Sequence, residues 1–151
     1  MIPEQGDMWS ILDTTDFFIV TTNSYIRIDG ALVMGRGIAK QLSTRFPQMP
    51  RNFAQQTKHL DTYGLIIHLR DDTNLGAFQV KHHFSDPATL SLIEYSTRHL
   101  TNLANRLPKQ RFDLNFPGIG NGRLAYNDVL PIVRQLPDNV HVWTFKPRDN
   151  P

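Results

Sequence analysis

The chain has 151 residues, of which 40% are hydrophobic and 20% are charged, a composition typical of a globular protein and not of a disordered one. Its 16 Lys and Arg residues against 14 Asp and Glu residues leave a net charge of +2, a smaller excess than a dedicated duplex-DNA-binding surface carries. The sequence contains no cysteine, which excludes a disulfide framework, a thiolate nucleophile and every cysteine-ligated metal site. We therefore expect one domain over residues 1–151, with a short polar tail from about residue 146.

No apolar run is long enough to cross a membrane, and the first residues show no signal-peptide pattern. We therefore expect a cytoplasmic protein without a membrane partner. The six histidines lack metal-ligand spacing, and no serine lies in a Gly-x-Ser-x-Gly pattern. We accordingly assign neither a metal site nor serine-hydrolase chemistry.

Short apolar runs alternate with longer amphipathic stretches along the chain. Strands are predicted, in chain order, at residues 16–22, 63–69, 76–82, 112–116 and 140–145. Helices are predicted at residues 37–46, 50–60, 86–108 and 126–136. This alternation predicts an α/β fold with three layers, α/β/α, around a mixed, mostly parallel sheet.

Two of the predicted helix starts depend on prolines. Asp86 followed by Pro87 predicts the start of the third helix, because Asp is a favoured N-cap and Pro fits the first helical position. Pro131 fits a helix only in its first turn, so we expect the fourth helix to begin later than residue 126.

Two glycine-rich segments each follow a predicted strand. The first runs through Gly30, Gly35 and Gly37 into a helix, and the second is Gly-Ile-Gly-Asn-Gly at residues 118–122. Glycine lets backbone amides approach a ligand closely, and a helix N-terminus adds N–H groups that bind phosphate. Two such loops at the carboxyl ends of sheet strands can clamp a diphosphate from both sides. Each loop alone is equally well explained as a tight turn, and neither has the phosphate-loop or dinucleotide-binding pattern.

Five ordered segments resemble macrodomains, especially the branch that contains the terminal ADP-ribose glycohydrolase and the antitoxins that reverse DNA ADP-ribosylation. They are Gly6-Asp7-Met8, the strand ending at Asn23, Met-Gly-Arg-Gly-Ile-Ala at residues 34–39, Val80-Lys81 with the proline-initiated helix after it, and the glycine loop at residues 118–122. The matches run in the family's order from residue 6 to about residue 145. The resemblance implies the three-layer macrodomain fold and ADP-ribose as the ligand.

The resemblance also implies roles for individual residues. Asp7, with the Met8 amide beside it, is expected to bind the adenine amine, Asn23 to hold the distal ribose, and Phe145 to form an aromatic wall. Backbone amides of the two loops are expected to surround the diphosphate and distal ribose, namely those of Gly35, Arg36, Gly37, Ile38, Gly118, Ile119, Gly120, Asn121, Gly122 and Arg123. Two simpler explanations remain open: a turn cap for Asp7 and a core position for Phe145.

Lys81 is the candidate catalytic residue. In the branch that this sequence resembles, the matching lysine attacks the anomeric carbon of the distal ribose, and an aspartate in the second glycine loop assists. Here Arg123 follows Gly122, and an arginine suits phosphate contact rather than acid–base catalysis. Asp29 in the first loop is therefore the candidate for the assisting carboxylate. The alternative for Lys81 is a solvated lysine at a strand end.

We therefore expect a monomer that binds ADP-ribose, or ADP-ribosylated protein or nucleic acid, without a further cofactor, and that hydrolyses an ADP-ribosyl linkage through Lys81. A non-catalytic ADP-ribose reader or sequestering protein and a phosphatase acting on ADP-ribose 1''-phosphate are alternatives within the same fold. A nucleic-acid module is an alternative from another class. The small net charge and the lack of interleaved aromatic and basic residues argue against it, and no sequence-specific binding of duplex DNA is expected.

Overall fold

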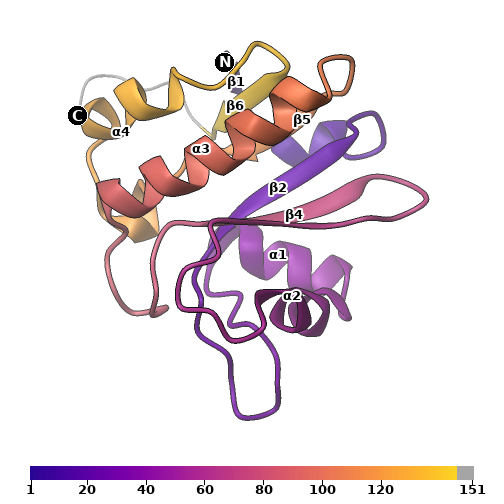
Figure 1. Cartoon of the computed structure of the whole chain (residues 1–151), viewed down its shortest axis with the longest axis vertical. Helices are drawn as coiled ribbons and strands as arrows, with labels where there is room; N and C mark the ends of the chain where they lie inside the picture. The colour runs from indigo at the N-terminus through magenta and orange to yellow at the C-terminus, as the bar shows by residue number, and fades with distance from the viewer. Residues whose placement is uncertain (146–151) are drawn as a thin grey trace.

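The computed structural model describes residues 1–145 and shows a six-stranded sheet with helices packed on both faces (Figure 1). The strands are β1 (Ile2–Gln5), β2 (Phe17–Thr22), β3 (Leu65–His68), β4 (Asn74–Gln79), β5 (Phe112–Asn115) and β6 (Val140–Thr144). The helices are α1 (Gly37–Arg45), α2 (Met49–Thr57), α3 (Leu90–Arg106) and α4 (Tyr126–Val133), with 3-10 turns η1 (Met8–Ile11) and η2 (Gly120–Gly122). The predicted three-layer α/β/α class is confirmed, whereas the predicted tail from residue 146 lies outside the described residues.

The strand order in the sheet is β1-β6-β5-β2-β4-β3. All neighbouring strands are parallel except β3 and β4, which form an antiparallel pair. Parallel strands need crossover connections, and α3 supplies the one from β4 to β5, which lie on either side of β2, while α4 supplies the one from β5 to its neighbour β6. The carboxyl ends of β2, β4, β5 and β6 consequently meet at one edge of the sheet.

Alternate side chains of β2 point to opposite faces of the sheet and enter two different cores. Phe17 and Ile19 belong to the core beneath α3 and α4, where the Phe17 ring stacks on Phe112 of β5 with centroids 4.3 Å apart. Phe18 and Val20 belong to the core beneath α1 and α2. Because both faces of β2 are buried, the strand reads as the continuous apolar run that the sequence shows.

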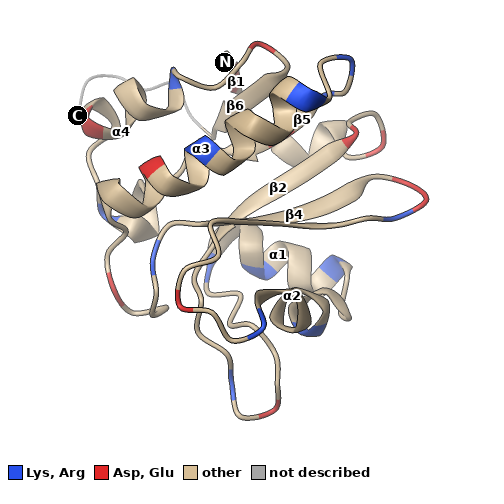
Figure 2. Ribbon diagram, viewed as in Figure 1, with Lys and Arg blue, Asp and Glu red and all other residues tan. Residues whose placement is uncertain are grey.

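Charged residues lie mainly in loops and helices, and strands β2 and β4 contain none (Figure 2). This distribution is the usual consequence of the cost of burying a charge. Within residues 1–145, no helix combines the length and the apolar character needed to cross a membrane.

β1 is a strand that the sequence pattern did not predict. It has only four residues and contains Pro3, which cannot donate a hydrogen bond to a neighbouring strand and is therefore tolerated at a sheet edge. β1 pairs in parallel with β6, from Ile2 opposite His141 to Gln5 opposite Thr144. Its partner lies at the other end of the chain, so no local pattern indicates the pairing.

The helix α3 begins later than predicted. Asp86 and Pro87 lie in the connection between β4 and α3, and the N-cap is Thr89. The Thr89 backbone is extended, with φ −121° and ψ 141°, and its hydroxyl accepts the N–H of Leu92. The prediction of an N-cap at Asp86 is therefore wrong, because the chain must first turn away from the end of β4 before a helix can start.

Pro131 lies in the second turn of α4, which begins at Tyr126 with Ala125 as its N-cap. The expectation of a later start is therefore wrong: the helix accommodates the missing N–H of Pro131 and ends soon afterwards, at Val133. The other predicted helices and strands are present, with ends shifted by a few residues.

We predict that Thr89→Ala lowers the free energy of unfolding by about 0.5–1 kcal/mol, because the first turn of α3 loses its side-chain acceptor. Urea denaturation followed by circular dichroism measures this change. Asp86→Ala is the matched control and is expected to change stability by less than about 0.5 kcal/mol. A larger loss for Asp86→Ala than for Thr89→Ala would contradict the cap assignment.

Candidate functional site

The sheet opens between β2 and β5 at their carboxyl ends. The two strands are paired only as far as Ile19 opposite Leu114, whereas β2 stays paired with β4 as far as Thr22. Beyond that point the Asn115 side chain bridges the gap: its Oδ1 accepts the N–H of Thr21 and its Nδ2 donates to the Thr21 hydroxyl, both at 2.9 Å. β5 and β2 are also the strands at which the connections change direction, which is where open α/β sheets bind ligands.

A cavity of about 1010 Å³ lies at this opening. Its walls come from the ends of four parallel strands and from the loops that follow them. The residues that line it are Thr21, Thr22, Asn23, Val33–Ala39, Val80, Lys81, Phe84, Ser85, Asn115, Phe116, Gly118–Arg123 and Trp143–Phe145. The cavity thus brings together Asn23, Lys81, Phe145 and parts of both glycine loops, for which the resemblance implied contact with a ligand.

The first glycine loop presents backbone to the cavity. Gly35 and Gly37 have φ of 46° and 64°, a region that other residues seldom adopt. A Cβ at Gly35 would meet nothing within 4 Å. Helix α1 begins at Gly37 with Arg36 as its N-cap, and no side chain caps it. The N–H groups of its first turn are therefore available to a ligand.

The second glycine loop contains glycines of two kinds. A Cβ at Gly118 would lie 2.5 Å from Ile93 Cδ1 of α3, and one at Gly122 would lie 3.0 Å from the Cβ of Ala88, so these two positions need glycine for packing. A Cβ at Gly120 would meet nothing within 4 Å, although its φ is 64°. Gly120 therefore faces open space on the cavity side, while its neighbours anchor the loop.

The charged side chains that line the cavity are all cationic: Arg36, Lys81 and Arg123, with no Asp or Glu among the described lining residues. The Arg123 guanidinium donates to the Ser85 carbonyl at 3.0 Å, which ties the second loop to the segment after β4. Desolvation lowers the pKa of Lys81, and Arg123 and Arg36 lower it further, against the opposing effect of Asp86. The site therefore favours an anionic ligand beside a lysine that loses its proton more readily than usual.

Asn23 lines the cavity and also shapes the loop after β2. Its side chain is 3% exposed; Nδ2 donates to the Val33 carbonyl and Oδ1 accepts the N–H of Tyr25, both at 2.8 Å. These bonds close the base of a hairpin in which Ile26 pairs with Leu32 and which projects at the bottom of Figure 1. Asn23 thus positions the first glycine loop, in addition to any contact with a ligand.

Two residues expected at the adenine end do not line the cavity. Asp7 is the N-cap of η1, and its Oδ1 accepts the N–H of Trp9 at 3.0 Å. Met8 is buried, at 4% exposure, in the core beneath α1 and α2. The simpler explanation for Asp7, a turn cap, therefore describes its contacts in this structure. Phe145 does line the cavity, and its side chain is 79% exposed rather than part of the core.

Asp29 lies in the projecting hairpin and not at the cavity that contains Lys81. Its carboxylate pairs with Arg27 and lies 3.8 Å from Arg51 Nη2, beside a separate cavity of about 400 Å³. The hydrogen bond from Arg27 lowers the pKa of Asp29. The structure therefore does not bring Asp29 to the cavity that Lys81 lines, because the hairpin places it beside the smaller one.

Trp143 and Asn115 are among the lining residues that the sequence reasoning did not name. Trp143 of β6 and Asn115 of β5 point to the face opposite the apolar residues of their strands, and both reach the cavity. The sequence did contain one signal: Asp113 is a charged residue inside an apolar strand, which indicates that the face of β5 shared by Asp113 and Asn115 does more than pack in the core.

We predict that Gly118→Ala destabilises the protein by about 1–2 kcal/mol more than Gly120→Ala. Both changes place alanine at a positive φ, so that cost is shared, but only the Gly118 substitution forces a methyl group against the buried Ile93 side chain. Chemical denaturation of the two variants measures the difference. Equal stabilities would mean that the packing contact at Gly118 is unimportant.

Solved structures of other proteins share this arrangement of strands, helices and loops. No family model and no curated protein matches the sequence. Among solved structures, the macrodomain of Thermus aquaticus DarG is similar with a TM-score of 0.75 and 20% identity, over 97% of both chains. The macrodomain of Mycobacterium tuberculosis DarG is similar with a TM-score of 0.71 and 22% identity, over 96% of this chain and 99% of that one.

A third similar structure is Thermosipho africanus DarTG in complex with ADP-ribose, with a TM-score of 0.78 and 18% identity. It matches all of this chain, which spans 43% of that protein. These identities bear on the fold alone, and the fold is the one that the ordered sequence motifs predicted. The chain therefore has the macrodomain fold, with its cavity at the carboxyl edge of the sheet.

Proposed function

We propose that this chain binds ADP-ribose in the cavity between the two glycine loops. One observation carries the proposal: two loops with open backbone at Gly35 and Gly120 face a cavity whose charged lining residues, within residues 1–145, are all cationic. Backbone N–H groups and cationic side chains favour a diphosphate, because its negative charge is stabilised by both. The Thermosipho africanus DarTG structure, which contains ADP-ribose, supports this choice of ligand.

The length of the cavity supports an extended nucleotide sugar. β6, β5, β2 and β4 are consecutive in the sheet, and three strand spacings amount to about 14 Å. Trp143 and Phe145 lie at the β6 end, Lys81 lies at the β4 end, and the loops after β2 and β5 lie between them. We therefore orient the ligand with its base at β6, its diphosphate at the glycine loops and its distal ribose beside Lys81.

For catalysis we propose that Lys81 hydrolyses an ADP-ribosyl linkage on protein or nucleic acid. The neutral Nζ would bond to the anomeric carbon of the distal ribose while the bond from that carbon to the carrier breaks. The electron pair leaves with the carrier, which takes the proton that Nζ loses. Water then cleaves the bond to Nζ, releasing ADP-ribose and restoring the amine. The lowered pKa of Lys81, caused by desolvation and by Arg123, is the observation that favours this step over a passive reader.

The carboxylate that influences Lys81 is Asp86 and not Asp29, the candidate from the sequence. Asp86 raises the pKa of Lys81, whereas Asp29 is paired with arginines beside another cavity. The mechanism proposed here needs no carboxylate to remove a proton, because the amine transfers its own proton to the carrier. Asp86 is then a modulator that holds the pKa of Lys81 higher than the two arginines alone would leave it.

Binding is tested by calorimetric titration with ADP-ribose, AMP and ATP. We expect a preference for ADP-ribose, because only this ligand spans the distance from Trp143 to Lys81. Gly120→Val is expected to weaken ADP-ribose binding at least about a hundredfold, or about 2.7 kcal/mol, since the side chain fills the space beside the loop.

Gly30→Val is the control for Gly120→Val, because Gly30 also has a positive φ, of 86°, but does not line the large cavity. It should retain the affinity of the wild type. A folded wild-type protein that does not bind ADP-ribose at millimolar concentration would refute the proposed function.

Turnover should rise with pH and level off above the lowered pKa of Lys81, because only the neutral amine attacks. Arg123→Gln removes a neighbouring cation and should move this inflection to higher pH, whereas Asp86→Asn should move it to lower pH. Lys81→Gln should abolish turnover and leave ADP-ribose affinity within about tenfold. The assay is release of ADP-ribose from modified protein and modified single-stranded DNA, measured at saturating substrate.

Asp29→Asn is the neutral control for these charge changes and should leave the inflection where it is. Phosphate release from ADP-ribose 1''-phosphate is measured in parallel, and activity on that substrate alone would favour the phosphatase. Turnover that survives Lys81→Gln would exclude the lysine mechanism. Tight binding by the wild type without turnover of any of the three substrates would make the protein a reader.

A further inference from the structure

Asp113 is a fully buried carboxylate in the middle of β5. Its neighbours in the strand, Phe112 and Leu114, are equally buried and belong to the core beneath α3 and α4, while Asp113 points to the opposite face. A buried charge is costly unless it is paired and hydrogen-bonded. Packing alone therefore does not explain an aspartate at this position.

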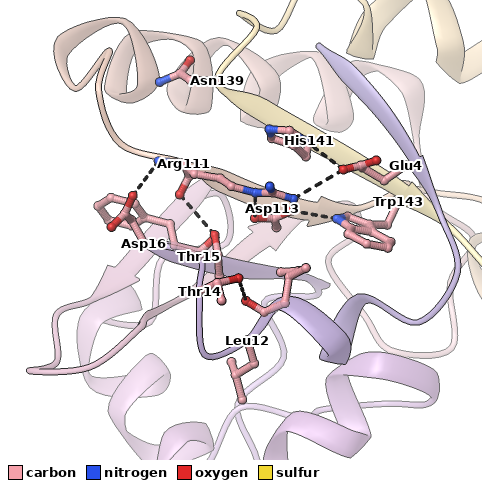
Figure 3. A network of polar contacts seen from close by, with 12 residues as sticks. Glu4, Leu12, Thr14, Thr15, Asp16, Arg111, Asp113, Asn139, His141 and Trp143 are labelled. Carbon is pink, nitrogen blue, oxygen red and sulfur yellow. Dashed lines mark hydrogen bonds and ion pairs between the residues drawn. The ribbon is translucent and has the colours of Figure 1, made fainter.

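The carboxylate of Asp113 accepts three hydrogen bonds (Figure 3). Arg111 Nε donates to Oδ2 at 2.9 Å and Arg111 Nη2 donates to Oδ1 at 3.0 Å. The indole Nε1 of Trp143 donates to Oδ1 at 2.7 Å. Arg111 also reaches Glu4 of β1 at 3.4 Å, and its backbone N–H donates to Asp16 at 2.7 Å. The network thus joins β1, β5, β6 and the start of β2 on one face of the sheet.

Trp143 connects this network to the ligand cavity. The residue is 9% exposed and lines the cavity at the β6 end. An indole has one polar atom, and a rotation of the ring that moved Nε1 away from Asp113 would break the 2.7 Å hydrogen bond to this buried carboxylate. Asp113 therefore selects a single orientation of the ring.

We propose that Asp113 is a positioning residue for ligand binding, which holds the Trp143 indole in place as the wall against which the base of the ligand packs. This inference rests on the proposed function and deepens it, since it assigns the orientation of the base-binding ring to a buried carboxylate that is paired with Arg111. Asp113 does not touch the ligand. Its effect is confined to the β6 end, because the diphosphate is held by glycine loops that the network does not contact.

The effect should consequently depend on which part of the ligand is present. Asp113→Asn keeps the size of the side chain but loses the ion pair with Arg111 and part of the hold on the indole. Its affinity for AMP and for ADP-ribose should fall about tenfold, because the ring must be ordered on binding. Its affinity for inorganic pyrophosphate, which has no base, should stay within about twofold of the wild type. A purely structural role for Asp113 would lower all three affinities together or none of them.

The experiment combines titration calorimetry with fluorescence. Trp9→Phe leaves Trp143 as the only tryptophan, so quenching by acrylamide reports on that ring alone. In this background Asp113→Asn should increase the quenching of the free protein, and Asp16→Asn should not. Asp16→Asn is the matched control because its carboxylate also contacts Arg111 but not the indole. Circular dichroism establishes that each variant is folded.

A measurement on the wild type covers the case in which Asp113→Asn does not fold. The Trp143 indole proton should exchange slowly with solvent in the free protein, and it should stay slow to exchange when AMP is added. Fast exchange in the free protein would overturn the inference. A folded Asp113→Asn variant that binds ADP-ribose, AMP and pyrophosphate as the wild type does would also overturn it, with the proposed function intact. If the wild type binds no ADP-ribose, the proposed function is refuted, and so is the assignment of Trp143 as the wall for the base.

Discussion

The separation of β2 from β5 beyond Ile19 and Leu114 is the constraint on which the rest of the site depends. Two parallel strands that part leave unpaired N–H and carbonyl groups, and burying these without partners would cost free energy. The Asn115 side chain supplies the missing partner, because it accepts the N–H of Thr21 and donates to the Thr21 hydroxyl. The sheet can therefore open at its carboxyl edge without losing order, and every segment that surrounds the cavity continues from a strand that ends there.

Rigid anchoring and open backbone are combined within each glycine loop. In the second loop, Gly118 and Gly122 pack against the α3 side of the molecule, and Gly120 between them faces open space. In the first loop, Asn23 closes the hairpin that precedes Gly35. A loop held in this way loses little conformational freedom when a ligand binds, so more of the contact free energy is available for affinity.

The two ends of the cavity differ in their electrostatics. At the β4 end, Lys81 lies in the field of Arg123 and Arg36, so an anionic group is favoured and the amine is easier to deprotonate. At the β6 end, the carboxylate of Asp113 is paired with Arg111 and accepts the indole N–H of Trp143, and Trp143 and Phe145 line the cavity. One end therefore offers cations and the other an aromatic wall.

The sequence by itself determined the α/β class, the two glycine loops and their order along the chain. Those properties are local: side-chain periodicity selects helix or strand, and positive φ values at Gly35 and Gly120 need glycine whatever surrounds them. Only the tertiary structure decided that β1 lies at the sheet edge, that Asp29 belongs to a separate cavity and that Asp113 holds Trp143. These depend on strand register and on where a hairpin projects, and both are set by packing between segments far apart in the chain, which no local pattern encodes.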